Sequence, residues 1–327
     1  MKIVATTGIS DIATVYIAKT SNGKYIEFVE SVQPPIPREL KWVLIVSTLF
    51  GCPVGCPICD AGGFYGGKLT KEEILSQIDS LITKRYPDRH VPVPKFKIQF
   101  ARMGEPSYNT AVLDVLEILP QMYEAPGLIP TISTIAPQSS DRFFKRLMRI
   151  KDDLYKDRFQ LQFSIHSTDA KQRDRLIPAK KWDLRTIAQY GQEFFRAGER
   201  KITLNFALAK DVSVDPEILI RYFNPELFFI KITPVNPTLR THQNKIFSRI
   251  HPDQNEYAII DALKAIGYEV LLSIGELEEN FIGSNCGQFI THYLHTEERI
   301  KEGYTYPIQY DHEQDGVFTL EKFYERE

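Results

Sequence analysis

Three cysteines lie within eight residues of one another, at Cys52, Cys56 and Cys59, and could bind a metal through their thiolates. Tetrahedral zinc sites usually close with four protein ligands, so a zinc site here needs an external fourth ligand such as His90. An iron-sulfur cluster that is held by three cysteines keeps one iron open for another molecule. The spacing favours such a cluster, and we expect the chemistry at its open iron; the zinc site remains an alternative.

A glycine-rich stretch follows the third cysteine and contains Gly62, Gly63, Gly66 and Gly67. Such a stretch could form a phosphate-binding loop, but no Lys-Ser or Lys-Thr pair follows in the form that a P-loop requires. We expect these glycines to let the backbone approach the cluster and its bound cofactor closely.

The pattern of apolar residues indicates which elements position the cysteine loop. Segments 13–19 and 25–32 alternate polar and apolar residues around Asn22-Gly23, which predicts a β-hairpin. Short apolar strands separated by helices then recur at regular spacing, which predicts a parallel sheet. We expect strands at 42–46, 96–100, 131–134, 159–164, 203–208, 228–233 and 269–273.

Helices between these strands are indicated by apolar residues at helical spacing. Thr70 and Glu73 have the spacing of a capping box, and Ile74, Ile78 and Leu81 then repeat on one face, so a helix begins soon after the cysteine loop. The same spacing recurs in three further sets, which are Val112, Val115, Leu116 and Leu119; Ile187, Tyr190 and Phe194; and Ile259, Leu263 and Ile266. We expect all of these side chains to belong to the core.

Polar residues gather where the predicted strands end. In a parallel sheet or barrel the carboxyl ends of the strands meet at one rim, where reactive groups collect. The segments at this rim are 52–59 after the first strand, 102–106 after the second, Ser133 in the third, Ser164-Ile165-His166 at the end of the fourth and Pro234-Val235-Asn236-Pro237 at the end of the sixth. Each also has a simpler interpretation as a turn, a strand end or an ordinary loop residue.

These motifs, in this order, resemble those of radical S-adenosylmethionine (SAM) enzymes. More narrowly, the chain resembles the ribosomal and transfer RNA adenine C2 methyltransferases and their antibiotic-resistance relatives that methylate adenine C8. The matching segments are Gly51-Cys52-Pro53-Val54-Gly55-Cys56-Pro57-Ile58-Cys59, Met103-Gly104-Glu105-Pro106, Ser164-Ile165-His166, Arg173-Asp174-Arg175-Leu176-Ile177-Pro178, Pro234-Val235-Asn236-Pro237 and Cys286-Gly287-Gln288. The resemblance implies an α/β fold, a partial (β/α)6 barrel over residues 39–290 with an N-terminal β-hairpin extension over 1–38 and a C-terminal extension over 291–327.

The resemblance also implies a cofactor site. Cys52, Cys56 and Cys59 would hold three irons of a [4Fe-4S] cluster, and the open iron would bind the amino and carboxylate groups of SAM. The residues implied in SAM binding are Gly104, Glu105, Ser133, Ser164, Ile165, His166 and Asn236. An electron from the cluster would release a deoxyadenosyl radical from SAM, while the protein aligns the reactants. The electron would come from a low-potential donor such as flavodoxin or ferredoxin.

Two catalytic residues, Cys286 and Glu30, are implied as well. In the family, the cysteine matching Cys286 takes a methyl group from one SAM, a radical from a second SAM abstracts hydrogen from that methyl, and the carbon radical adds to the base. A second cysteine then frees the enzyme, but Ile45 occupies its position here, and none of the four cysteines can replace it. Glu30 matches a glutamate proposed as general base. An inert Cys286 and a Glu30 without a catalytic role remain alternatives.

The composition bears on the substrate. The 327 residues are 43% hydrophobic and 25% charged, with a formal net charge of −2, which is a globular balance without a general attraction to nucleic acid. Few residues precede the predicted hairpin, so we do not expect the helical RNA-binding domain of the family. We therefore expect one-carbon transfer through Cys286 to a substrate other than ribosomal RNA, which could be a small molecule, a peptide or another RNA.

Three other functions remain open. They are a divergent RNA adenine methyltransferase, a radical SAM enzyme that abstracts hydrogen directly from its substrate without methylation, and a non-catalytic metal-binding protein. The sequence has neither a long apolar run nor a secretory leader, and its clustered cysteines suggest a reducing compartment. We therefore expect a cytoplasmic protein that does not span a membrane.

Overall fold

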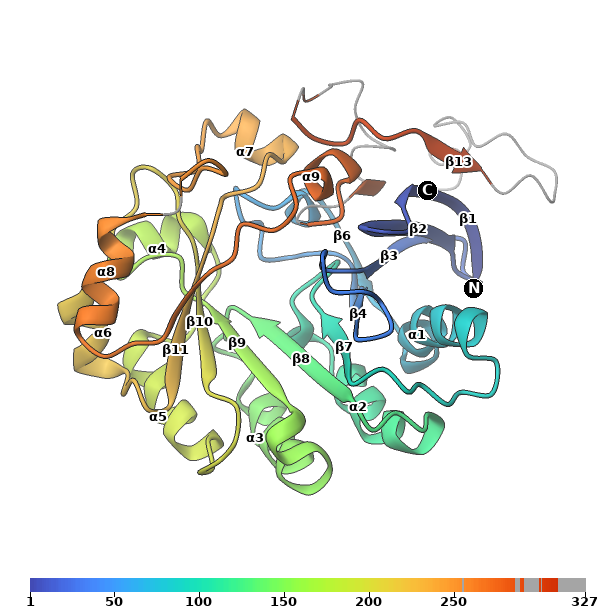
Figure 1. Cartoon of the computed structure of the whole chain (residues 1–327), viewed down its shortest axis with the longest axis horizontal. Helices are drawn as coiled ribbons and strands as arrows, with labels where there is room; N and C mark the ends of the chain where they lie inside the picture. Colours follow the sequence, from blue (N-terminus) through green and yellow to red (C-terminus); the bar gives the residue numbers. More distant parts are fainter. Residues whose placement is uncertain (255, 286–288, 291–299, 301, 311–327) are drawn as a thin grey trace.

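A curved sheet of eleven strands forms the centre of the computed structural model, which describes residues 1–254, 256–285, 289–290, 300 and 302–310 (Figure 1). The order of its strands is β12-β11-β10-β9-β8-β7-β4-β3-β2-β1-β13, and β5 and β6 form a separate pair. The strands are β1 (Lys2–Ile9), β2 (Ala13–Lys19), β3 (Tyr25–Ser31), β4 (Lys41–Val46), β5 (Leu49–Gly51), β6 (Tyr65–Lys68), β7 (Lys95–Phe100), β8 (Leu128–Thr134), β9 (Gln160–Ser164), β10 (Ile202–Ala207), β11 (Phe228–Thr233), β12 (Val270–Leu272) and β13 (Ile308–Tyr310).

In the large sheet, β4, β7, β8, β9, β10, β11 and β12 are parallel neighbours, and helices separate most of them along the chain. These are the strands that the sequence predicts, with small differences at their ends. Because β12 and β13 are the two edges of the described sheet, the barrel is open. The predicted α/β fold with a partial barrel is therefore confirmed, whereas the proposed boundaries at residues 38 and 290 stay predictions.

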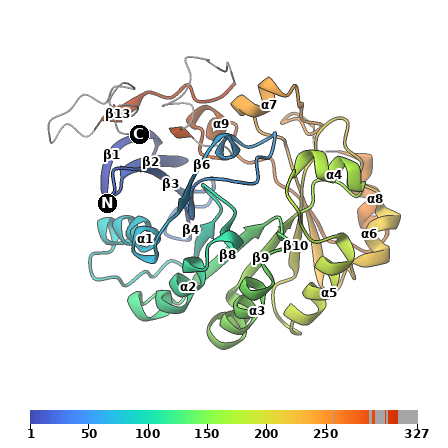
Figure 2. The ribbon, with the colours of Figure 1, turned by 180° about the vertical axis from the view of Figure 1, so that it is seen from behind.

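Helices cover the convex side of the parallel strands, as the views from the front and from behind agree (Figures 1 and 2). They are α1 (Lys71–Arg85), α2 (Ala111–Met122), α3 (Asp141–Ile150), α4 (Ala170–Leu176), α5 (Leu184–Phe194), α6 (Pro216–Tyr222) and α8 (Ala258–Ala265). Two short helices, α7 (Leu239–Gln243) and α9 (Glu278–Ile282), lie instead beyond the carboxyl ends of the strands. The predicted capping box of α1 is present, since Thr70 accepts from the N–H of Glu73 and Glu73 accepts from that of Thr70.

The two faces of the parallel strands differ in chemistry. In β7, Phe96, Ile98 and Phe100 are buried against the helices, while Lys97 and Gln99 alternate with them and point into the barrel. Outward apolar residues of β4, β8 and β9 join the same core, which also contains the predicted apolar faces of α1, α2 and α5. On β7 the inward face is therefore polar and is available to bind polar molecules.

The N-terminal strands extend the sheet beyond β4. Strands β2 and β3 form the predicted hairpin, with Gly23 at a φ of 83° in its turn. The sequence prediction missed β1, which pairs with β2, and β13, which pairs with β1. Strand β3 joins β4 in antiparallel orientation, so the hairpin continues the barrel sheet. No described helix is long and apolar enough to cross a membrane.

Candidate active site

The cysteine loop begins at the end of β5 and is closed by β6. The N–H of Cys52 donates to the carbonyl oxygen of Phe64 at 2.9 Å. Gly51 has a φ of 75°, and a Cβ at this position would lie 2.0 Å from the same carbonyl oxygen. At Gly62 a Cβ would lie 2.8 Å from the Cα of Gly55, within the loop itself. These glycines therefore allow the loop to fold tightly on its own backbone.

The three cysteines are half-buried, and none of them forms a disulfide bond with another described cysteine. Burial raises the pKa of Cys52 to about 11, although the backbone N–H groups of Val54, Glu105 and Gly55 favour its thiolate. Burial and the neighbouring Cys52 raise the pKa of Cys56 to about 12, while the positive charge of Arg240 opposes the rise. Without a bound cation the thiols of Cys52 and Cys56 are therefore protonated, and binding of iron must release their protons.

Three cysteine thiolates are the ligands of an iron-sulfur cluster that keeps one iron open. Among the residues that the structure describes, no three His, Cys, Asp or Glu side chains are grouped closely enough to hold one metal ion. Cysteines of a cluster bind different irons, so they lie farther apart than the ligands of one zinc ion. His90 pairs instead with Glu124, at 3.3 Å, ahead of the amino end of β7. The alternative zinc site with His90 as a ligand is therefore wrong.

Helix α7 holds the cysteine loop through Arg240. Its Nε donates to the carbonyl oxygen of Cys56 at 3.0 Å, and its Nη2 donates to that of Gly55 at 3.1 Å. In return, the carboxylate of Asp60 accepts from the backbone N–H groups of Leu239 and Arg240, at 3.2 and 2.9 Å. The buried Asp60 also accepts from the hydroxyl of Tyr304 at 2.7 Å. The sequence analysis missed these residues, although Asp60 directly follows the cysteine motif.

Glu105 lies at the same rim with a buried carboxylate that accepts several hydrogen bonds. Its Oε1 accepts from the N–H and the hydroxyl of Ser107, at 3.1 and 2.6 Å, and from the hydroxyl of Thr134. Its Oε2 accepts from the N–H of Ile135 at 2.9 Å. Burial raises the pKa of Glu105, and these hydrogen bonds oppose the rise. Since each carboxylate oxygen can accept two hydrogen bonds, Oε2 can still receive an ammonium donor.

The glycine that precedes this carboxylate is required by the close approach of β5. Gly104 has a φ of 97°, and a Cβ there would lie 2.5 Å from the side chain of Leu49. The N–H groups of Thr48 and Leu49 also donate to the carbonyl oxygen of Met103. The second motif is thus fixed directly against the strand that leads into the cysteine loop.

His166 lies at the end of β9 with one ring nitrogen engaged. Its Nδ1 accepts from the N–H of Ala207 at 3.0 Å, so the neutral ring carries its proton on Nε2. Burial, together with the positive charge of Arg173, lowers the pKa of His166 to about 4. The neighbouring Ile165 is buried and donates its N–H to Asn205, while Ser164 is half-buried on the inward face of β9.

The remaining residues implied in SAM binding lie on neighbouring parts of the rim. Ser133 is half-buried in β8, and its hydroxyl accepts from the side chain of Gln162 at 3.3 Å. Asn236 is half-buried between β11 and α7, and its carbonyl oxygen accepts from Thr241 at 3.2 Å. An apolar cluster that includes Val54, Ile135 and Val235 joins these loops to Cys52 and Cys56.

Glu30 is not brought to this rim, and its expected catalytic role stays a prediction. Its carboxylate accepts from the hydroxyl of Tyr16 at 2.6 Å, from the indole of Trp42 at 3.2 Å and from Arg85 of α1 at 3.2 Å. Trp42 belongs to the core on the outer side of the sheet. Although burial opposes it, the pKa of Glu30 is lowered by Tyr16 and Arg85. Its partners make it a structural carboxylate between sheet and helix.

Glu27, on the same strand, forms instead an ion pair that the sequence analysis missed. Its carboxylate lies 2.7 Å from Nε of Arg102, and both side chains are almost completely buried. Arg102 donates to the carbonyl oxygens of Gly283 and Ser284, at 2.6 and 2.9 Å. Glu27 accepts from the backbone N–H groups of residues 289 and 290, at 3.1 and 2.7 Å. The pair therefore holds the chain on both sides of residues 286–288.

Cys286 itself lies outside the described residues. Ile45, which occupies the position of the family's second cysteine, packs on an apolar cluster that includes Ile282, Phe289 and Ile290. The structure thus brings Ile45 close to the segments that flank Cys286.

Comparison with known proteins supports the resemblance, although no family model matches the chain. A probable dual-specificity RNA methyltransferase RlmN of Thermus thermophilus is 26% identical over 259 residues, which cover 77% of this chain and 68% of that protein. A protein of the same description from Desulfitobacterium hafniense is 27% identical over 281 residues, 84% of this chain and 74% of that protein. A crystal structure of a radical SAM methyltransferase from Sphaerobacter thermophilus matches with a TM-score of 0.63 and 21% identity, over 88% of this chain and 81% of that one. These findings confirm the resemblance and the fold.

Proposed function

We propose, on the premise that this chain is an enzyme of the radical SAM methyltransferase kind, that Cys52, Cys56 and Cys59 hold a [4Fe-4S] cluster beside a SAM site. When bound, the cluster supplies the electron that cleaves SAM to a 5′-deoxyadenosyl radical. One observation carries this proposal: the loop with Glu105 lies against the cysteine loop. The backbone N–H of Glu105 favours the thiolate of Cys52, and the carboxylate of Glu105 lies close to the same thiol. Three cysteines without a disulfide bond among the described residues suit a reducing compartment such as the cytoplasm, with flavodoxin or ferredoxin as the electron donor.

The residues of the rim then have distinct tasks. Oε2 of Glu105 accepts from the ammonium group of SAM, and the close packing of Gly104 on Leu49 fixes the position of this carboxylate beside the cysteine loop. The Nε2–H of His166 is a neutral donor to the cofactor, and Ser133, Ser164, Ile165 and Asn236 complete the wall. The apolar side chains of Val54, Ile135 and Val235 exclude water from the cluster loop.

One-carbon transfer through Cys286 is the proposed use of the radical. Support comes from the motif Cys286-Gly287-Gln288 and from the ion pair of Glu27 and Arg102, which holds the chain on both sides of it. Ile45 leaves the enzyme without the family's releasing thiol, so the product must leave Cys286 by another route. For this reason we propose a substrate other than ribosomal RNA.

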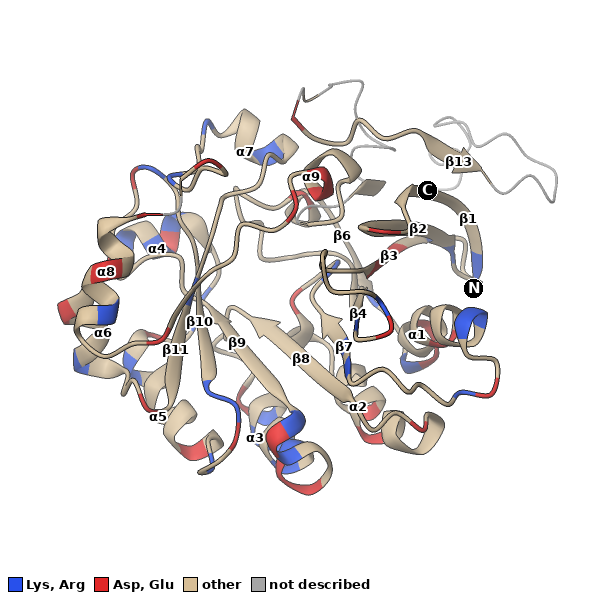
Figure 3. Ribbon diagram, viewed as in Figure 1, with Lys and Arg blue, Asp and Glu red and all other residues tan. Residues whose placement is uncertain are grey.

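The distribution of charged residues is consistent with a substrate other than ribosomal RNA. Positively and negatively charged residues are mixed along the outer helices such as α1 and α3 (Figure 3), and the formal net charge is −2. Binding to a large folded RNA usually uses an extended positive surface that neutralises many phosphates.

Methylation of an RNA adenine is the second candidate, and the names of the curated relatives favour it. In this case a thiol from outside the chain would release the enzyme from its covalent product. In the family, the cysteine that matches Ile45 performs this step. The position of Ile45 against the apolar cluster with Phe289 makes this idea testable.

Product analysis after anaerobic reconstitution tests the first part of the proposal. Cluster-loaded protein with SAM and a strong reductant should form 5′-deoxyadenosine, whereas the variant Cys56→Ala should not. Wild-type protein that carries the cluster but never forms 5′-deoxyadenosine would contradict the proposal. Mass spectrometry of the peptide with Cys286 should then detect a methyl group, and its absence after turnover would remove Cys286 as the carrier.

The variant Ile45→Cys separates the two candidate substrates. If only the releasing thiol is missing, this variant should methylate an adenine in RNA, while wild-type protein should do so only with added thiol. If neither protein modifies RNA but both form 5′-deoxyadenosine, the RNA candidate is wrong and the first proposal stands.

A further inference from the structure

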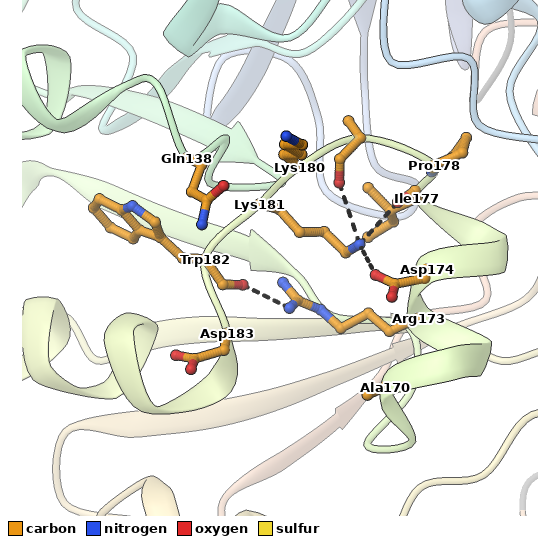
Figure 4. A pocket seen from close by; sticks show the side chains of 11 residues that line it. Gln138, Ala170, Arg173, Asp174, Ile177, Pro178, Lys180, Lys181, Trp182 and Asp183 are labelled. Carbon is orange, nitrogen blue, oxygen red and sulfur yellow. Dashed lines mark hydrogen bonds and ion pairs between the residues drawn. The ribbon is translucent and has the colours of Figure 1, made fainter.

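A cavity of about 630 Å³ lies between the end of α4, the segment that leads into α5 and the loop after β8 (Figure 4). Its lining includes Gln138, Arg173, Ile177, Lys180, Lys181 and Trp182, and none of the residues assigned above to the cluster or to SAM. Hydrogen bonds from the N–H of Trp182 to Ala136 and from that of Gln138 to Lys180 join its two walls. The volume is in the range of sites for small ligands.

Arg173 is buried at this cavity with part of its guanidinium group unused. It is 5% exposed, and its Nη1 donates to the carbonyl oxygen of Trp182 at 2.7 Å. Its Nε and Nη2 have no hydrogen-bond partner among the described residues. These two nitrogens form the edge of the guanidinium group that binds two oxygens of one anion side by side.

Nearby carboxylates do not satisfy this edge. Asp174 pairs with Lys181 at 2.5 Å, and Asp183 accepts from the N–H of Thr186 at the start of α5. Burial lowers the pKa of Arg173 to about 10, so the group still carries its charge at neutral pH. Asp174 and Asp183 act on this charge from nearby, but neither binds this edge, so a bound anion would remove part of the remaining cost of burying the cation.

Lys180 adds a second cation at the cavity. It is exposed, lines the cavity and forms no ion pair with a described residue. A carboxylate could be satisfied by the edge of Arg173 alone, whereas a phosphate has further oxygens for the ammonium group of Lys180. A phosphate by itself is much smaller than the cavity, so there is room for an attached group.

We propose that this cavity binds a phosphate group, with Nε and Nη2 of Arg173 on two of its oxygens and Lys180 on a third. The phosphate belongs either to a free nucleotide or to the end of an oligoribonucleotide. The site adjoins the candidate active site without being part of it, because Ile177 lines the cavity and also packs in the apolar cluster with Cys52 and Cys56. The cavity and the cysteine loop therefore border the same apolar cluster.

Calorimetric titration of the full chain with AMP, adenosine, inorganic phosphate and a 5′-phosphorylated oligoribonucleotide tests the proposal without SAM cleavage. Wild-type protein should bind AMP at least about tenfold more tightly than adenosine. Arg173→Gln should lose about tenfold or more in affinity for the phosphorylated ligand, and Lys180→Gln should lose less. Arg175→Gln is the matched control, because Arg175 is exposed on the same helix and pairs with Asp211.

The outcomes are distinct. If AMP does not bind but the oligoribonucleotide binds, and if Arg173→Gln weakens that binding, the phosphate comes from RNA and the phosphate site is supported. If AMP and adenosine bind with equal affinity, or if neither phosphorylated ligand binds, then only water contacts Nε and Nη2 of Arg173 and the proposal is wrong. If Arg173→Gln does not fold, the exposed Lys180→Gln decides, and unchanged affinity in that variant overturns the proposal.

Discussion

The guanidinium group of Arg240 donates to the carbonyl oxygen of Cys56 at 3.0 Å, so a short helix late in the chain holds the backbone of a proposed cluster ligand. Arg240 also places a positive charge near the thiol of Cys56 and favours its thiolate. The same residue therefore acts on the shape of the loop and on its electrostatics.

Replacing Arg240 by Gln should weaken the cluster. We expect cluster affinity to fall on the order of 10- to 100-fold, as is usual when a residue that supports metal ligands is removed. The reduction potential should become more negative, because a positive charge near the cluster is lost. Iron and sulfide analysis after anaerobic reconstitution, followed by a redox titration, measures both effects. The exposed Arg249→Gln is the control, and equal iron content and potential in the two variants would contradict the role of Arg240.

Replacing Glu105 by Gln should weaken SAM binding. The amide retains one acceptor oxygen for Ser107 and Thr134, but its NH2 group faces the N–H of Ile135 and cannot accept from an ammonium group. We expect roughly 10- to 100-fold lower affinity for SAM, the usual effect of losing a hydrogen bond to a charged group. Equilibrium binding of SAM to cluster-loaded protein is the measurement. The exposed Glu193→Gln should bind SAM normally, and normal binding by Glu105→Gln would refute the assignment.

The buried pair of Glu27 and Arg102 should be strongly coupled. Arg102→Met leaves the carboxylate of Glu27 buried without its cation, which should cost about 3 to 5 kcal/mol in the free energy of unfolding. The double variant Glu27→Leu/Arg102→Met removes both charges and should be more stable than the sum of the two single losses implies. Urea unfolding of the four proteins measures the coupling. Strictly additive losses would show that the pair is not a unit.

The stability of the protein should depend on pH through Lys97, on the inward face of β7. Burial and the positive charge of Lys95 lower the pKa of Lys97 to about 7, whereas an unfolded lysine has a pKa of about 10.4. Between these values the unfolded chain binds a proton that the folded chain has released. The free energy of unfolding therefore rises with pH in this window, by up to about 1.4 kcal/mol per pH unit for this group.

Urea unfolding at pH 7, 8 and 9 measures this dependence, with Lys97→Met as the test variant. The thiols with raised pKa values oppose the trend equally in both proteins, so the difference between them reports Lys97. The exposed Lys145→Met should keep the slope of the wild type. Identical slopes in Lys97→Met and the wild type would mean that Lys97 stays protonated at pH 9.

Much of the fold could be predicted because its signals are local. The capping box at Thr70 and the apolar face of α1 need only neighbouring residues, and the parallel strands are short apolar runs between helices. The rim position of the cysteine loop then followed from the rule that reactive groups follow parallel strands. These parts of the prediction needed no knowledge of long-range packing.

The contacts that build the site could not be predicted in the same way. Asp60 and Arg240 are 180 residues apart along the chain, and periodicity carries no information on such a pair. On β3, nearly every residue is buried, so polar-apolar alternation does not say which glutamate faces the barrel interior. The family resemblance predicts Glu30 as a catalytic residue. In the structure, Glu27 contacts Arg102, whereas Glu30 contacts Arg85 of α1.

The two edges of the large sheet have a further consequence for the behaviour of the protein in solution. Strands β12 and β13 are each three residues long, so each edge offers few free backbone groups to another chain. Long exposed edges recruit strands from neighbouring molecules, and short ones resist this. An open barrel with such edges can keep its interior accessible without exposing a surface on which copies of the chain would aggregate.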